Sequence, residues 1–198
     1  IRPDRMEKEY GQTITEYTWS ISDGSLAGDD QLEDLKINVT LTAGNAEKEN
    51  CTVGLYDITE KTPLTADNAN YTVLFKPGTL QVQPKPLGVV WNTDGTVIYT
   101  GKEANVSAEF TGVLFEDDCK AVVEGGNEIK TGTYTATIVG MIGEQSDNYV
   151  LHGEDTDYQI DYQIVKKEET KNPTDSKETS TGTAGKKPTG TSVSGKQV

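Results

Sequence analysis

The chain has 198 residues, with 32 Asp and Glu against 18 Lys and Arg, so its formal net charge at pH 7 is −14. A surface this acidic repels phosphate backbones and anionic membranes, so we expect no nucleic-acid binding and no membrane contact within this fragment. Mutual repulsion between copies favours a monomer. Because the chain begins with Ile1 rather than Met and has no signal peptide, we interpret it as a mature or excised part of a longer protein.

The first 84 residues show the pattern of half-buried strands. Apolar side chains alternate with polar ones in residues 37–41, 71–75 and 80–82, and this period of two is typical of strands that bury one face. Between them, residues 29–36 (DDQLEDLK) predict a single helical turn capped by Asp29 or Asp30. The polar stretch 43–50 predicts a surface loop.

Residues 83–86 (QPKP) separate this region from a second one, because two prolines remove backbone donors and interrupt a strand. Alternation returns in residues 134–138 and 158–164. Residues 166–198 contain no aromatic residue, Leu or Ile, so they cannot offset their ordering entropy by burial. We therefore predict a first β-module at 1–84, a second at 85–166, and a disordered Thr/Ser/Gly/Lys-rich linker or stalk at 167–198.

The two modules carry the same landmarks in the same order. The distance from the Gly-x-Leu element to an Asp pair is five residues in each copy, and that from Gly-x-Tyr to Asn-Tyr is 16 in each. The first copy is ten residues longer in its middle, around 43–50, and one residue longer between its first tyrosine and the Gly-x-Leu element. The landmarks are Tyr10-Gly11, Gly24, Leu26, Asp29-Asp30, Gly54, Tyr56 and Asn70-Tyr71 in the first copy, and Tyr99, Gly101, Gly112, Leu114, Asp117-Asp118, Gly132, Tyr134 and Asn148-Tyr149 in the second.

These elements predict an all-β fold made of two tandem Ig-like β-sandwich modules and a tail. A β-grasp arrangement is the alternative, and it requires residues 29–36 to form a helix that packs on a sheet.

The ordered landmarks, together with the closing stretch 79–84 (TLQVQP), resemble the bacterial MBG modules of the YGX type. The resemblance covers about residues 8–165, although the second copy has Tyr-x-Gly at its start and no terminal proline, and so also resembles other bacterial Ig-like surface repeats. The family implies an extracellular place on the bacterial cell surface and no defined ligand. The tail resembles wall-spanning stretches of Gram-positive surface proteins, without an LPxTG-type signal.

The repeated acidic pairs and tyrosines are the candidate site residues. Asp29, Asp30, Asp117 and Asp118 are candidate Ca²⁺ ligands, but we favour turn and cap chemistry for them and predict no metal site. Likewise, the tyrosines that follow Gly-x and Asn are glycan-platform candidates, but we favour core positions with hydrogen-bonded hydroxyls. Cys51 and Cys119 lie one in each module, so a bridge within a module is impossible. A bridge between the modules would need Cα atoms within about 7 Å; we favour two incidental thiols over this alternative.

The sequence offers no catalytic constellation and no cofactor motif. His152 is the single histidine, so a multi-histidine zinc site is excluded, and we interpret His152 as a surface residue among acids. There is no Gly-x-Ser-x-Gly elbow, P-loop or dinucleotide fingerprint. A carboxylate-pair glycosidase needs a deep cleft that modules of this size rarely provide. We therefore expect no enzyme and no cofactor.

Two functions remain. The favoured one is a non-catalytic extracellular spacer that carries another part of a surface protein away from the cell wall. The alternative is an adhesin module that binds host glycan or matrix protein, which would need an exposed aromatic or apolar patch or a groove.

Overall fold

A computed structural model describes residues 1–151 and 158–167. Residues 1–167 form one compact unit, and the predicted tail at 167–198 lies almost entirely outside the described residues. The fold is all-β, as predicted: thirteen strands and three 3-10 turns are present, and the described residues contain no α-helix. Nothing in this part of the chain is a helix of the length and apolarity that crossing a membrane requires.

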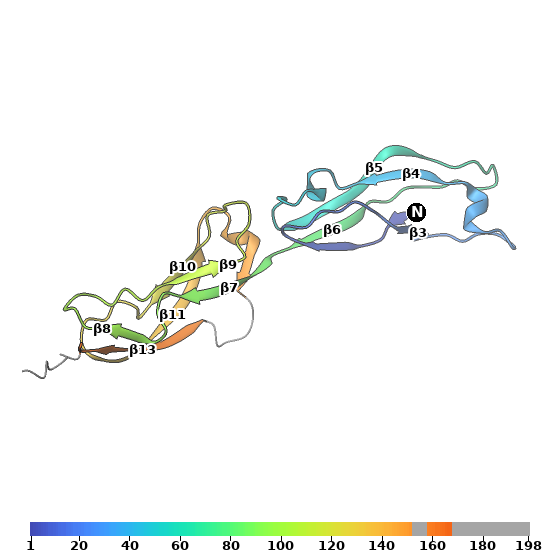
Figure 1. Cartoon of the computed structure of the whole chain (residues 1–198). Helices are drawn as coiled ribbons and strands as arrows, with labels where there is room; N and C mark the ends of the chain where they lie inside the picture. The colour runs from blue at the N-terminus through green and yellow to red at the C-terminus, as the bar shows by residue number, and fades with distance from the viewer. Residues whose placement is uncertain (152–157, 168–198) are drawn as a thin grey trace, which may run out of the picture. The chain divides into compact units, whose positions relative to one another are not determined.

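Four strands of the first half form one mixed sheet (Figure 1). Its first and last strands in the sequence lie side by side and parallel, and the other two follow in antiparallel pairs. A separate pair, β1 (Arg2–Pro3) and β3 (Trp19–Ser20), is antiparallel. The sheet order is β2 (Met6–Glu9), β6 (Gly78–Gln83), β5 (Gly54–Thr65) and β4 (Asn38–Thr42).

The second half contains a four-stranded sheet with the same order and the same strand directions. It also contains a three-stranded sheet in which β7 is parallel to β12 and antiparallel to β9. The larger sheet consists of β8 (Thr96–Ile98), β13 (Gln159–Val165), β11 (Gly132–Ile142) and β10 (Lys120–Glu124), and the smaller one of β12 (Tyr149–Leu151), β7 (Lys85–Trp91) and β9 (Ala108–Thr111).

Each large sheet buries one face, as the period of two predicts. Leu80 lies opposite Tyr56 in the first sheet, and Tyr162 lies opposite Tyr134 in the second. Leu80 belongs to a cluster with Ile58, and Tyr162 to a separate cluster with Ala136. At about 25 cal/mol per Å² of apolar surface, such burial is the main stabilising contribution to each sheet.

Pro84 lies between the end of β6 and the start of β7. The interruption is a single residue, because β6 ends at Gln83 and β7 begins at Lys85 (Figure 1). The module boundary at 84 and the Ig-like assignment of the sheets both stay predictions.

The helical turn predicted in residues 29–36 exists, but its predicted cap is wrong. The turn is a 3-10 helix at Leu32–Leu35, and the residue before it is Gln31 rather than Asp29 or Asp30. Asp34 provides the capping carboxylate, because its Oδ2 accepts a hydrogen bond from the Gln31 N–H at 2.7 Å. The acidic pair stands too far upstream for this role.

The stretch 43–50 is largely exposed, as its polarity predicts, but it is also anchored to the core. It contains the 3-10 turn Gly44–Glu47, and Ala46 is 1% exposed within the Ile58–Leu80 cluster. The buried Lys8 of β2 reaches this stretch and donates from Nζ to the Lys48 carbonyl at 2.5 Å. One small apolar side chain and one buried cation therefore attach the longer middle of the first half to its core.

Candidate functional site

A tyrosine and an aspartate close one loop in each half of the chain. In the second half, the Leu114 N–H donates to the Tyr149 hydroxyl at 2.9 Å, and this hydroxyl donates to Asp117 Oδ2 at 2.6 Å. The Asp117 N–H also donates to the Leu114 carbonyl at 2.9 Å. We call this arrangement, made by Leu114, Asp117 and Tyr149, the second clamp.

The first half contains the same arrangement, which we call the first clamp. The Ala27 N–H donates to the Tyr71 hydroxyl at 2.8 Å, and this hydroxyl donates to Asp30 Oδ2 at 2.6 Å. Asp30 therefore has the role of Asp117, whereas the spacing in the sequence pairs Asp117 with Asp29. The hydrogen bonds of the two clamps therefore correspond after a shift of one residue in this loop.

Among the residues that the structure describes, a third group binds to the second clamp and not to the first. The Tyr10 hydroxyl donates to Asp117 Oδ2 at 2.8 Å, so this one carboxylate oxygen accepts two phenolic hydrogens. Tyr10 follows β2 of the first half and is 3% exposed. A hydrogen bond to a carboxylate is worth about 1.5–3 kcal/mol when its partners are sheltered from water. We call the region around Tyr10 and the second clamp the junction.

Apolar packing surrounds these hydroxyls. Tyr10, Leu87, Cys119 and Tyr149 form one buried cluster. The rings of Tyr10 and Tyr149 meet edge to face with centroids 5.4 Å apart, which is a favourable geometry for an aromatic pair. The junction thus combines a small core with a shared carboxylate.

Position 11, directly after Tyr10, requires a glycine for two reasons. A Cβ at this position would collide with the Leu114 side chain, and the φ of Gly11 is +96°, a value that side-chain-bearing residues rarely adopt. The loop on the other side is itself strained, because Phe115 and Glu116 have φ values of +55° and +60°. Non-glycine residues in this region indicate that the surrounding contacts hold the loop in place.

Two polar contacts flank the junction. The Val53 N–H donates to Asn148 Oδ1 at 3.1 Å, and Lys85 Nζ lies 3.2 Å from Glu9 Oε1. Asn148 is buried, and the Val53 N–H satisfies its amide oxygen. The Asn-Tyr landmark therefore contributes both of its side chains to the junction.

Burial and the shared carboxylate change the acidity of the junction tyrosines. Desolvation, and then the hydrogen bond to Asp117, raise the pKa of Tyr149 to about 12 and also raise the pKa of Tyr10. In the first clamp the hydrogen bond to Asp30 raises the pKa of Tyr71. Burial raises the pKa of the Cys119 thiol, which disfavours the reactive thiolate.

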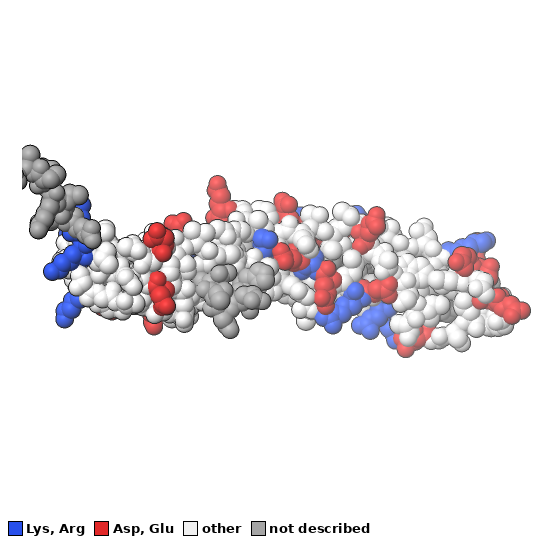
Figure 2. Space-filling model, turned by 60° about the horizontal axis from the view of Figure 1, so that its bottom comes forward, with Lys and Arg blue, Asp and Glu red and all other residues white. Residues whose placement is uncertain are grey.

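The four candidate Ca²⁺ ligands lie in the clamp loops with different partners. Asp30 and Asp117 accept tyrosine hydroxyls, and Asp118 Oδ1 accepts a hydrogen bond from Lys120 Nζ at 2.6 Å. Asp29 contributes only its carbonyl, to the Gln31 side chain. Within residues 1–151 and 158–167, no three His, Cys, Asp or Glu side chains gather where a metal ion could bind. Figure 2 shows acidic side chains interspersed with neutral ones over the visible face.

The Gly-x-Tyr landmark is a repeated local structure. The Tyr56 hydroxyl donates to the Thr52 carbonyl at 2.8 Å, and the Tyr134 hydroxyl donates to the Lys130 carbonyl at 3.0 Å. In each case the ring lies over the glycine two residues earlier. Of the four tyrosines predicted in the core, Tyr149 is buried and the other three are partly exposed, but the hydroxyls of all four are hydrogen-bonded.

Cys51 and Cys119 are both free thiols. Cys119 is buried in the junction cluster, whereas Cys51 is partly exposed and packs against the core of the first half. His152 lies outside the described residues.

The contact of Tyr10 with the second clamp is the functional feature that sequence reasoning missed. Tyr10-Gly11 stood out only as a landmark of the repeat. The sequence did mark the position, because a tyrosine followed by glycine at the end of a strand indicates that both residues have a specific structural role. The partner of Tyr10 is 107 residues away, and no local pattern identifies it.

One comparison with known proteins gives a match. Residues 1–81 match the family model of the MBG domain (YGX type), which confirms the predicted resemblance for this part of the chain. None of the curated proteins and none of the solved structures compared with the chain matches it.

Proposed function

We propose, from the MBG match of residues 1–81, that the chain is a non-catalytic, extracellular part of a bacterial cell-surface protein and acts there as a spacer. In this proposal residues 85–166 are a second module of the same type. Three features support the duplication: the equal order and direction of strands in the two large sheets, the two clamps, and the two Gly-x-Tyr structures.

The junction is the observation that carries the spacer function. A spacer holds its length only if successive modules do not swing freely about their connection. The connection at Pro84 is a single residue, and the junction adds a buried aromatic pair and a shared carboxylate beside it. These contacts oppose motion between the two large sheets.

Backbone ¹⁵N relaxation of the full chain tests this proposal. We expect residues 6–83, 85–151 and 158–165 to report one common rotational correlation time. Tyr10→Ser removes the ring together with the phenolic hydroxyl that reaches Asp117, so the two halves should then report separate, shorter correlation times. Tyr99→Ser is the matched control, because Tyr99 is 42% exposed and its loss should change nothing. Separate correlation times in the unaltered chain would overturn the rigid spacer.

Binding and location are tested separately. The full chain is applied to an array of glycans and host matrix proteins, and a spacer should give no saturable signal. Saturable binding would replace the spacer with the adhesin alternative. An antibody against the chain should label intact cells of the source bacterium, and labelling only after lysis would contradict the extracellular assignment.

A further inference from the structure

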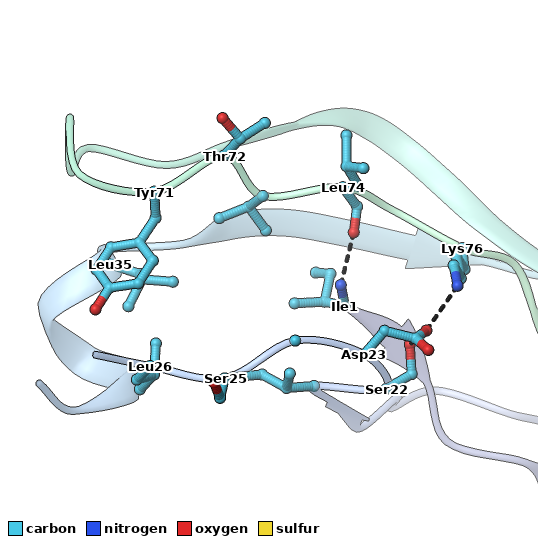
Figure 3. Close-up of a pocket in the computed structure, with 13 residues that line it drawn as sticks. Ile1, Ser22, Asp23, Ser25, Leu26, Leu35, Tyr71, Thr72, Leu74 and Lys76 are labelled. Atoms are coloured by element: carbon cyan, nitrogen blue, oxygen red, sulfur yellow. Dashed lines mark hydrogen bonds and ion pairs between the residues drawn. The ribbon is translucent and has the colours of Figure 1, made fainter. Parts of the chain in front are cut away.

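A cavity of about 260 Å³ lies in the first half, between residues 21–26 and 71–74. Figure 3 shows Leu26, Leu35 and Tyr71 turned toward one another at one end of it, with Ile1 further along. Small-molecule sites typically measure roughly 300–1,000 Å³. This cavity is smaller than that range, and its apolar wall suits one or two apolar side chains.

The backbone along the cavity has room for another strand. The α-amino group of Ile1 donates to the Leu74 carbonyl at 2.6 Å, and the Lys76 N–H donates to the Ile1 carbonyl at 2.9 Å. These bonds continue β1 by one residue beyond its pairing with Trp19–Ser20. Further along, no strand of the described chain pairs with residues 71–73 or 21–24.

In the second half the corresponding place is filled. Strand β7 lies between β9 and β12 and runs from Lys85 to Trp91. β1 pairs with β3 through Pro3 and Trp19, and β7 pairs with β9 in the same way through Trp91 and Ala108. Pro3 therefore corresponds to Trp91. Two residues earlier, Ile1 corresponds to Val89. Lys85–Gly88 of β7 therefore has no counterpart in the first half.

Leu87 is the side chain that fills the space. It lies two residues before Val89, on the same face of the strand, because side chains of a strand alternate with a period of two. Leu87 is 1% exposed and packs in the cluster that contains Tyr149. Tyr149 is the clamp tyrosine that corresponds to Tyr71, and Tyr71 lines the cavity.

We infer that the groove of residues 21–26 and 71–74 accepts one extended strand, which is joined to Ile1 and places a Leu-sized apolar side chain two residues before it. Addition of such a strand to an open edge supplies main-chain hydrogen bonds, and the pocket selects the side chain. The bond from Ile1 to the Leu74 carbonyl is kept, since an amide N–H donates as the α-amino group does. The inference holds whether or not the chain is a spacer.

The test extends the full chain by Lys-Pro-Leu-Gly, the sequence of residues 85–88, directly before Ile1. The matched control carries Lys-Pro-Ser-Gly, which keeps the length, charge and backbone but not the apolar side chain. We expect the first extension to raise the Tm by roughly 5 °C or more, as burial of a Leu side chain in a domain of this size should. We also expect hydrogen exchange of the amides in residues 71–74 to slow by about tenfold or more.

The control should show less than half of each effect. Equal shifts from the two extensions would overturn the role of the pocket, because a longer chain alone would explain them. Unchanged exchange in residues 71–74 would overturn the added strand even if the Tm rose. Neither result depends on the tumbling or binding experiments that test the spacer function.

Discussion

Tyr10 and Tyr99 each follow the first strand of a four-stranded sheet, β2 and β8 respectively, but they have different surroundings. The N–H of each donates to the last strand of its own half, to Gln83 and Val165 respectively. Tyr10 is 3% exposed and Tyr99 is 42% exposed, because only Tyr10 has a clamp packed against it. The exposure of each tyrosine is thus set by contacts outside its own sheet.

Removal of the Tyr10 hydroxyl tests this difference. Tyr10→Phe should lower the free energy of unfolding by about 1.5–3 kcal/mol, since it deletes a sheltered hydrogen bond to a carboxylate and keeps the ring. Tyr99→Phe should stay within about 0.5 kcal/mol of the unaltered chain. Urea unfolding followed by tyrosine and tryptophan fluorescence measures both. Equal effects would show that the Asp117 contact contributes nothing.

The junction tyrosines also predict a loss of stability at alkaline pH. Their folded-state pKa values lie above the ordinary value of 10, with Tyr149 at about 12. A raised folded-state pKa stabilises the fold at pH values below 10, and this contribution is lost as pH rises toward the folded-state value. The free energy of unfolding should therefore decrease between about pH 10 and 12, and this decrease should be smaller in Tyr149→Phe. Parallel pH profiles of the two proteins would contradict the assignment.

At the scale of elements, the turn Gly44–Glu47 combines exposed polar residues with one buried position, Ala46. The backbone of this stretch lies against the core, and Lys8 and Tyr17 bind it: Lys8 at the Lys48 carbonyl, and Tyr17 at Glu47 Oε1 at 2.9 Å. The ten additional residues of the first half thus form part of its structure.

Substitution of Ala46 tests whether this turn contributes to the core. Ala46→Leu should destabilise the chain by about 1–3 kcal/mol, because the added methylenes have no space beside Ile58 and Leu80. Asn45→Ala, in the same turn but exposed, should change stability by less than about 0.5 kcal/mol. Thermal unfolding of the two variants provides the measurement. An Ala46→Leu variant as stable as the unaltered chain would show that Ala46 is not a tightly packed core position.

At the scale of the whole molecule, the chain carries many acidic side chains, and two of them accept hydrogen bonds in the clamp loops. Asp30 and Asp117 act as acceptors for tyrosine hydroxyls that are distant in the sequence, which differs from the local turn and cap chemistry that we favoured over Ca²⁺ binding. The surplus of 14 negative charges is the reason that we predict a monomer, because like charges repel one another.

Calcium titration distinguishes the two roles of the aspartates. We expect millimolar Ca²⁺ to leave the Tm unchanged, because Asp117 already accepts two hydroxyls and Asp118 is paired with Lys120. Calorimetry of the full chain with and without Ca²⁺ tests this. A rise in Tm that disappears in Asp118→Asn would instead establish a Ca²⁺ site.

The sequence by itself determined the all-β class of the fold and predicted a repeat. Alternation with a period of two predicted β6 and β13, since side-chain direction in a strand is a local property. The Gly-x-Tyr and Asn-Tyr spacings predicted a duplicated module, and residues 1–81 match the MBG family. Local patterns failed where a residue depends on distant partners: Ala46 appeared exposed, and the Asp pairs appeared equivalent.

Only the tertiary structure decided which repeated residues act together. Tyr10 and Asp117 are far apart in the sequence and meet because β6 leads into β7 with one residue between them. The open groove beside Tyr71 likewise became visible only when β1 could be compared with β7. Contacts between sheets depend on how whole elements pack, and packing leaves no periodic signal in the sequence that local reasoning can detect.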